Sequence, residues 1–463
     1  MSNYFNLKNI FVILIWISIW LSIGINPDYI FKFQYNFQNL FNSDFIKLLR
    51  ILVPIILSLM WILFILKNKR FLKIAFSINL TSIFLILYFL TQLFSLMLSN
   101  NYFINFYWIY FPFIMLTLVN FILIDNDEKI CFQLNLISMI ILFFVFLKFI
   151  YPLFLNFFSS TLSFYNMWPT VYAYDFTVPR PTGLARTALL LIAFLLCFNF
   201  NNIIYKIVRY PLIIFFGLNI CLFQSRTILF LWPVIIFLIL FFKNQSLKNK
   251  IKELALILIL PIILFYGMNL SKISYNYLIA YKVFKSQNVE NKETSIFNFK
   301  EYKEFIEKPK NSDKYEVQVY RDTDPKSFSS FRTLHWKKIF LKIKENNFIG
   351  YGPMGDRYII NNTASSIIFY SLSSGGIYGL ITIILLCLRS LYLISFFILK
   401  KKCFSRDNYE LINFSCLILV ILFLRGVLET SIGIFSIDYC MYILPALFVE
   451  YKYNLLKEKL DQF

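Results

Sequence analysis

One stretch decides how this chain can fold: residues 331–380, FRTLHWKKIFLKIKENNFIGYGPMGDRYIINNTASSIIFYSLSSGGIYGL. It ends a long polar segment in an otherwise apolar sequence. Gly350, Gly352, Pro353 and Gly355 predict a tight turn, and a sequence rich in serine and glycine then leads into a hydrophobic helix. A charged, structured loop beside an apolar helix indicates a place where a water-soluble group meets a lipid.

The composition is typical of a membrane protein with many helices. The chain has 463 residues, of which 59% are hydrophobic, 20% aromatic and 15% charged. Apolar runs of about 20 residues, the length that crosses a bilayer core of about 30 Å, recur along it. The net charge of +20 is better explained by basic loops that fix topology and touch anionic lipid than by nucleic-acid binding. We therefore expect no nucleic-acid partner.

Hydropathy predicts about twelve transmembrane helices in an all-α bundle. They are expected near residues 9–25, 46–66, 74–98, 103–124, 131–155, 187–203, 209–224, 227–242, 254–268, 371–399, 409–427 and 432–450. The prolines inside these runs are compatible with membrane helices, where neighbouring groups can satisfy the freed carbonyl.

Lysine and arginine set the expected orientation. They gather in alternate connections, at residues 67–73, 206–209, 243–252 and 400–406, and in the C-terminal tail. The positive-inside rule places these on the cytoplasmic side, with both termini cytoplasmic. The sequence thus predicts a bundle over residues 1–268, a large, partly helical periplasmic loop over 269–366, and about three further helices over 367–463. The expected location is the bacterial inner membrane.

The loop ends in an amphipathic segment. Residues 331–343 carry apolar side chains at helical spacing, and Arg332 and His335 are neighbours on that helix, followed by Trp336.

The order of motifs resembles the O-antigen polymerase and ligase superfamily, most closely the Wzy-type polymerases. The resemblance rests on R-x-x-x-W at 332–336, F-I-G-Y-G-P-M-G-D-R at 348–357, A-S-S at 364–366 and G-G-I-Y-G-L at 375–380. Three further motifs agree: R-P-T-G-L-A-R-T-A at 180–188, Q-S-R-T at 224–227 and R-G-V-L-E-T-S-I-G-I-F-S-I-D-Y at 425–439. Ligases of the family carry a His-Asn pair where this chain has Ser365 and Ser366, which favours the polymerase.

The resemblance implies glycosyl transfer between polyprenyl-pyrophosphate-linked oligosaccharides at the periplasmic face, without metal or other cofactor. It implies a lipid-linked donor and acceptor, with a chain-length regulator and a flippase as further partners. The chemistry requires fixed cations for the pyrophosphate leaving group and a proton acceptor for the attacking hydroxyl. Arginine fits the first role because its planar fork binds phosphate bidentately and keeps its charge.

The candidate residues follow from these roles. The expected catalytic residues are Arg180, Arg226, Arg332, Asp356, Glu429 and His335, and the expected substrate-binding residues are Arg186, Trp336, Tyr351, Arg357, Ser365, Arg425 and Asp438. We expect Arg180, Arg226 and Arg332 to converge on one cavity, and an acidic residue to be a better proton acceptor than the lone histidine.

Each candidate also has a purely structural interpretation. Loop arginines can be solvated, Asp356 and Arg357 can stabilise a turn, and Arg425 can pair with Glu429 one helical turn away. The alternative functions are an O-antigen ligase that transfers polymer to lipid A core, a flippase for the same lipid-linked sugar, and a membrane scaffold. A flippase is less favoured because the sequence shows no evident internal repeat.

Overall fold

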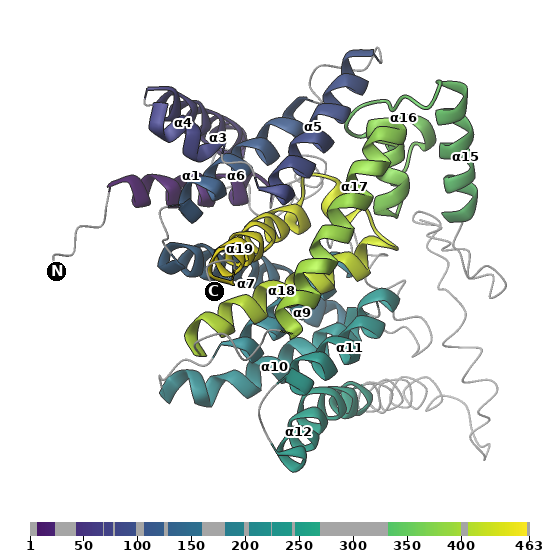
Figure 1. Cartoon of the computed structure of the whole chain (residues 1–463). Coiled ribbons are helices and arrows are strands. Elements are labelled where there is room, and N and C mark those ends of the chain that lie inside the picture. Colours follow the sequence, from purple (N-terminus) through teal and green to yellow (C-terminus); the bar gives the residue numbers. More distant parts are fainter. Residues whose placement is uncertain are drawn as a thin grey trace, which may run out of the picture.

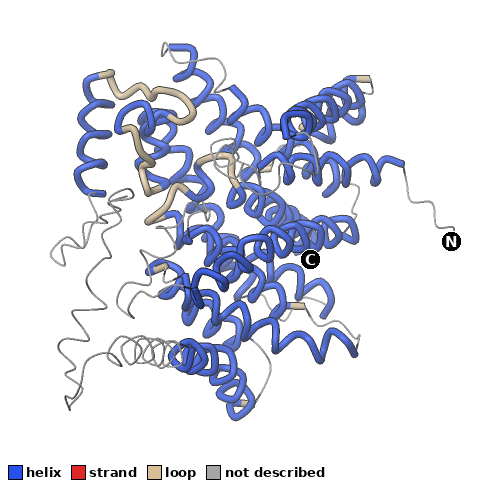
Figure 2. The backbone as a smooth tube through the Cα atoms, turned by 180° about the vertical axis from the view of Figure 1, so that it is seen from behind, coloured by secondary structure: helices blue, strands red, loops and turns tan. Residues whose placement is uncertain are grey.

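The computed structural model describes residues 7–23, 43–67, 69–76, 79–98, 106–124, 128–159, 181–198, 203–223, 225–242, 246–268, 332–399 and 406–460. These residues form helices and the connections between them, and they contain no strand (Figures 1 and 2). The predicted all-α class is therefore confirmed.

The helices of the first part of the chain are α1 (Leu7–Ile23), α3 (Ser43–Leu66), α4 (Lys69–Ala75), α5 (Leu80–Leu98), α6 (Tyr107–Ile124), α7 (Glu128–Ser159), α9 (Pro181–Cys197), α10 (Ile203–Phe223), α11 (Arg226–Phe242) and α12 (Leu247–Leu254). A π-helical turn, η3 (Ala255–Ile259), continues α12. The later helices are α15 (Arg332–Glu345), α16 (Gly355–Ile360), α17 (Ile367–Leu399), α18 (Arg406–Gly426), the short 3₁₀ turn η5 (Ser431–Gly433) and α19 (Ile437–Leu460).

Several helices have the length and composition to cross a bilayer. Five described segments do so: Leu80–Leu98, Glu128–Leu147, Ile203–Phe223, Leu247–Met268 and Ile367–Leu399. A bent pair, Leu52–Leu66 with Lys69–Ala75, turns by 118° and makes a sixth if it is one span. The count of twelve spans and the sidedness of the loop stay predictions.

Local chemistry explains two boundaries that differ from expectation. The run expected at 74–98 is divided, because Asn79 starts a new helix: its side-chain Oδ1 accepts a hydrogen bond from the Ser82 N–H at 2.7 Å. The helix expected at 187–203 is α9, which begins earlier, at Pro181. Proline suits the first helical position because no N–H is needed there.

A break in α17 positions the polar end of the bundle. Gly376 has a left-handed φ of 64°, and the segment after α15 lies against this break. The Tyr351 and Gly352 amides donate to the Ser373 and Ser374 carbonyls at 2.8 and 2.9 Å, while the Ile377 amide donates to the Phe348 carbonyl at 3.0 Å. The loop thus provides hydrogen-bond partners for backbone groups on both sides of the break. Figure 1 shows α15 and α16 beside the end of the bundle where α17 begins.

Helix α19 carries a charged group deep in the bundle. Glu450, 1% exposed, accepts hydrogen bonds from Thr81 Oγ1 at 2.6 Å and from Arg389 Nε and Nη2 at 2.9 and 2.6 Å. Lys452 pairs with Glu128 of α7. These contacts fasten α19 to α5, α7 and α17, and they show how apolar helices accommodate ionised groups by pairing them.

Candidate functional site

Three residues from two separate sequence motifs meet in one buried ion cluster. Arg186 of α9 and Arg425 of α18 each donate through Nη1 to Asp438 of α19, one to each carboxylate oxygen. All three are buried, and Asp438 is only 1% exposed. We call these three residues the arginine–aspartate triad. Arg425 therefore pairs with Asp438, and not with Glu429 as its helical spacing suggested.

The helix ends explain why charges are tolerated here. Arg425 lies in the last turn of α18 and Asp438 in the first turn of α19. The free carbonyls at a helix C-terminus favour a cation, and the free amides at an N-terminus favour an anion. The connection between the two helices folds tightly, with the Ser431 hydroxyl donating to the Leu422 carbonyl at 3.0 Å.

A second, looser ion pair lies beside the triad. Arg332 Nη2 of α15 is 4.0 Å from Glu429 Oε1 in the turn after α18, and their side chains are 30% and 17% exposed. Glu429 also interacts electrostatically with both Arg186 and Arg425. The pair therefore extends the triad towards solvent.

The charges of this group do not cancel. Three arginines face two carboxylates, so within the described part of the chain one positive charge of this group is uncompensated. Arg186 Nε is buried and has no hydrogen-bond partner among the residues that the structure describes. A buried donor without an acceptor costs about 1–3 kcal/mol. Excess positive charge and an unused guanidinium donor are features that an oxyanion would satisfy.

Helix α15 holds Arg332 through an aromatic anchor. The Trp336 indole N–H donates to the Ala364 carbonyl at 2.7 Å, and its ring stacks on Phe369 of α17 with centroids 4.8 Å apart. Trp336 therefore fixes α15 against α17, and its expected role in substrate binding stays a prediction. His335 precedes it on the same helix and is half-buried.

Asp356 holds a turn together. Its Oδ1 accepts from the Arg357 amide at 2.9 Å and its Oδ2 from the Ala364 amide at 2.8 Å. Burial raises the pKa of this carboxyl above its usual value, and the backbone donors counteract part of that shift. Because both oxygens are engaged, the turn-stabilising interpretation of Asp356 agrees best with the structure.

The other candidates lie around the same turn. Tyr351 is half-buried, with its ring 5.3 Å from that of Tyr358, and burial raises its pKa. Arg357 is exposed on α16. Ser365 has a left-handed φ of 50°, and its hydroxyl lies 3.4 Å from that of Thr363.

Two predicted arginines cannot be placed from the structure. Arg180 lies outside the described residues, and Arg226 is the first residue of α11 but its side chain lies outside them. The expected convergence of Arg180, Arg226 and Arg332 therefore stays a prediction. Among the described residues, Arg332 instead joins Glu429 and lies beside the triad.

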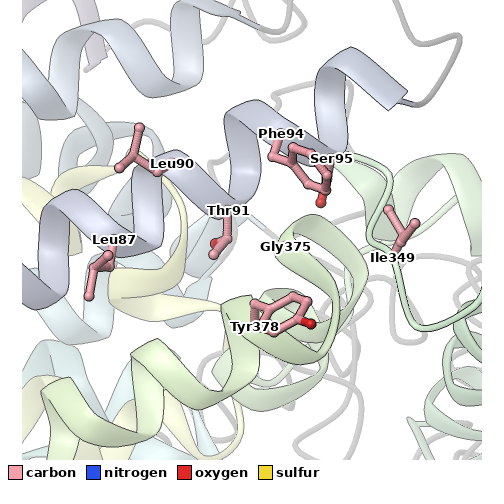
Figure 3. A pocket seen from close by; sticks show the side chains of 8 residues that line it. All are labelled: Leu87, Leu90, Thr91, Phe94, Ser95, Ile349, Gly375 and Tyr378. Carbon is pink, nitrogen blue, oxygen red and sulfur yellow. The ribbon is translucent and has the colours of Figure 1, made fainter.

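An apolar cavity of about 210 Å³ lies between α5 and α17. Figure 3 shows its walls: Leu87, Leu90, Thr91, Phe94 and Ser95 from α5, Gly375 and Tyr378 from α17, and Ile349 from the loop between. Gly375 permits the close approach, since a Cβ there would lie 2.8 Å from Thr91 Oγ1. Sequence reasoning missed this cavity, because its lining consists of residue types common in any membrane helix.

The cavity and the triad share a link through α5. Tyr88, one residue after Leu87, donates its hydroxyl to the Gly433 carbonyl at 2.8 Å. Gly433 belongs to η5, in the connection that joins Glu429 to Asp438. The helix that forms one wall of the cavity is thus hydrogen-bonded to the segment that carries both acids of the site.

Within the described residues no group of three or more histidine, cysteine, aspartate and glutamate side chains is arranged to hold a metal ion. A comparison with models of known protein families found no match, and neither did a comparison with curated proteins.

Proposed function

We propose that this protein is a membrane glycosyltransferase that polymerises polyprenyl-pyrophosphate-linked oligosaccharide repeat units, as an O-antigen polymerase does. The observation that carries the proposal is the charged group formed by the triad with Arg332 and Glu429. It lies at the polar end of an apolar bundle, and the described residues leave one of its positive charges uncompensated. A pyrophosphate leaving group at a lipid boundary needs such a cationic site.

The arginines are assigned to the leaving group. As the bond between the anomeric carbon and the phosphate oxygen breaks, its electron pair passes to the pyrophosphate, which gains negative charge. Arg186, Arg425 and Arg332 stabilise that charge through guanidinium N–H donors. In this proposal the arginines supply the positive charge, and no cofactor is invoked.

Glu429 is assigned as the proton acceptor. The attacking hydroxyl of the acceptor sugar gives its proton to a carboxylate as its oxygen bonds to the anomeric carbon. Asp438 accepts from two arginines and Asp356 from two backbone amides. Glu429 is partly exposed and its Oε1 lies 4.0 Å from Arg332 Nη2, so its oxygens are the most available of the three carboxylates.

The hydrocarbon chain of the substrate is assigned to the cavity between α5 and α17. Both walls are helices with the length and composition to cross a bilayer, and Leu90, Phe94 and Tyr378 are more than half exposed at its mouth. An isoprenoid chain fits that lining because burial of its methyl and methylene groups is favourable. In this arrangement the bundle has about twelve spans in the bacterial inner membrane, and α15 and α16 lie on the periplasmic face.

Gel analysis of surface polysaccharide from a deletion strain tests the proposal. A polymerase defect leaves one repeat unit on the lipid core. Free lipid-linked polymer would instead identify a ligase, loss of both products a flippase, and an unchanged ladder a protein outside this process.

A further inference from the structure

Asp438 is the one member of the charged group whose two carboxylate oxygens are both engaged by arginines. Arg186 reaches Oδ1 from α9, and Arg425 reaches Oδ2 from α18. Asp438 thus joins three helices at one point. A carboxylate held by two charge-assisted hydrogen bonds has its strongest acceptor directions occupied, and it is poorly suited to take a proton from a substrate.

The two guanidinium groups need this carboxylate to stay together. Arg186 and Arg425 repel each other electrostatically, and both are buried, 7% exposed each. Two like charges are costly in a site that excludes water. One carboxylate between them offsets the repulsion and fixes their separation, while one positive charge remains.

The donors that Asp438 leaves unused are the functional part of the arrangement. A guanidinium has five N–H donors in a rigid fork, and Asp438 engages Nη1 of each arginine. Arg186 Nε has no acceptor within the chain that the structure describes, although it is buried. A phosphate oxygen is an acceptor of the right charge for such a donor.

We infer that Asp438 is a positioning residue that holds Arg186 and Arg425 as a paired clamp for the oxygens of a pyrophosphate group. This inference rests on the proposed function for the identity of the ligand. It assigns Asp438 no contact with the reacting atoms: Asp438 acts through the two arginines.

The chain offers a matched control on the same helix. Glu450 of α19 is also 1% exposed and hydrogen-bonded to an arginine, Arg389. Twelve residues separate it from Asp438, about 18 Å along the helix. Loss of either acid breaks a buried ion pair and destabilises the protein, but only loss of Asp438 releases the clamp.

The test measures binding of inorganic pyrophosphate to the full chain in nanodiscs of neutral phosphatidylcholine, by titration calorimetry, together with thermal stability. The variants are Asp438→Asn, Glu450→Gln and the double variant Asp438→Asn with Arg425→Gln, which keeps the net charge of the triad. We expect Asp438→Asn to weaken pyrophosphate binding by at least about tenfold, because the guanidinium groups of Arg186 and Arg425 are then no longer held in the orientation that binds the ligand. Glu450→Gln should lower thermal stability while leaving the affinity within about threefold.

The double variant separates positioning from simple charge neutralisation. It should recover thermal stability but not affinity. Recovery of affinity would overturn the inference, as would equal losses of affinity in the two single variants or a wild-type protein that does not bind pyrophosphate. If Asp438→Asn does not fold, Asp438→Glu replaces it: the longer carboxylate should fold and bind more weakly, and wild-type affinity in that variant would also overturn the inference.

The two proposals fail in different ways. If the affinities follow the expected pattern while deletion of the gene leaves the polysaccharide ladder unchanged, the proposed function is wrong and the oxyanion clamp stands. If deletion leaves a single repeat unit on the lipid core while pyrophosphate affinity is the same in all variants, the positioning role is wrong and the polymerase proposal stands.

Discussion

Arg186 and Asp438 form a buried ion pair although 252 residues separate them in the sequence. The pair joins α9, in the first half of the chain, to α19, the last helix. Replacement of Arg186 should therefore lower the rate of the proposed reaction more than replacement of a solvated loop arginine would.

Replacement of Arg186 by glutamine should lower the rate of polymerisation by about 10²–10³-fold, the usual loss when one positioned donor to a developing charge is removed. Arg186→Lys should recover only part of the rate, because a point charge cannot reproduce the fork. Chain-elongation rate per amount of folded protein measures both. Full activity of the lysine variant would contradict a bidentate role.

Replacement of Glu429 by glutamine should abolish elongation while leaving pyrophosphate affinity within about threefold, because the amide cannot accept the proton but keeps the shape of the side chain. Replacement of Asp356 by asparagine should instead lower the stability of the protein and leave the chemical step intact. If folded Glu429→Gln protein elongates chains at the normal rate, another residue is the proton acceptor.

The turn from Asp356 to Ala364 should respond to pH. Burial raises the pKa of Asp356 above its ordinary value of 3.8, so the folded form holds the proton more tightly than the unfolded chain does. The contribution of this group is therefore largest below pH 3.8 and falls as the pH rises through the raised folded pKa. The protection factor of the Ala364 amide, which corrects its exchange rate for base catalysis, should decrease across that window and then level off.

The Asp356→Asn variant is the control for this pH response. It cannot titrate, so its Ala364 amide should lack the transition, and at neutral pH it should exchange faster because one backbone donor is left unpaired, a loss of about 1–3 kcal/mol. The same pH transition in the variant would show that another group causes it.

Gly376→Ala should destabilise the protein by at least about 1–3 kcal/mol, since a side chain there has to adopt a strained left-handed φ and its Cβ would lie 2.2 Å from the Phe348 carbonyl oxygen. Gly267→Ala is the matched control, because a Cβ there meets nothing within 4 Å. Thermal unfolding in detergent compares them. Equal stability of both variants would contradict the loop-capped break in α17.

Leu90→Trp should fill the cavity between α5 and α17 and reduce crosslinking of a photoactivatable polyprenyl pyrophosphate to α5. Leu63→Trp on α3 is the control, because Leu63 is 67% exposed and does not line the cavity. Equal crosslinking in both variants would place the hydrocarbon chain elsewhere.

Much of the fold could be predicted from the sequence, because apolar runs of membrane length and capping residues act locally. The break at Gly376 was not foreseen, since it depends on backbone hydrogen bonds from Tyr351 and Gly352 that a linear pattern does not reveal. The boundary at Asn79 was detectable in principle, as asparagine is a strong N-cap residue.

The site could be predicted as a set of residues but not as an arrangement. Arg186, Arg425 and Asp438 stood out because charged residues in or beside apolar helices need partners, yet spacing alone favoured Arg425 with Glu429. Tertiary packing brings α9 to α18 and α19 and decides the pairing. Arg389 and Glu450 carried the same signal and were missed, and the structure shows them satisfied by each other.

The most direct test of the central claim uses purified protein in nanodiscs with lipid-linked repeat units as both donor and acceptor. We expect a ladder of lengthened lipid-linked products, release of one polyprenyl pyrophosphate for each unit added, and a decrease of about 10²–10³-fold in both rates in Arg186→Gln. If intact wild-type protein binds the lipid-linked unit but forms no lengthened product, the protein is not a polymerase.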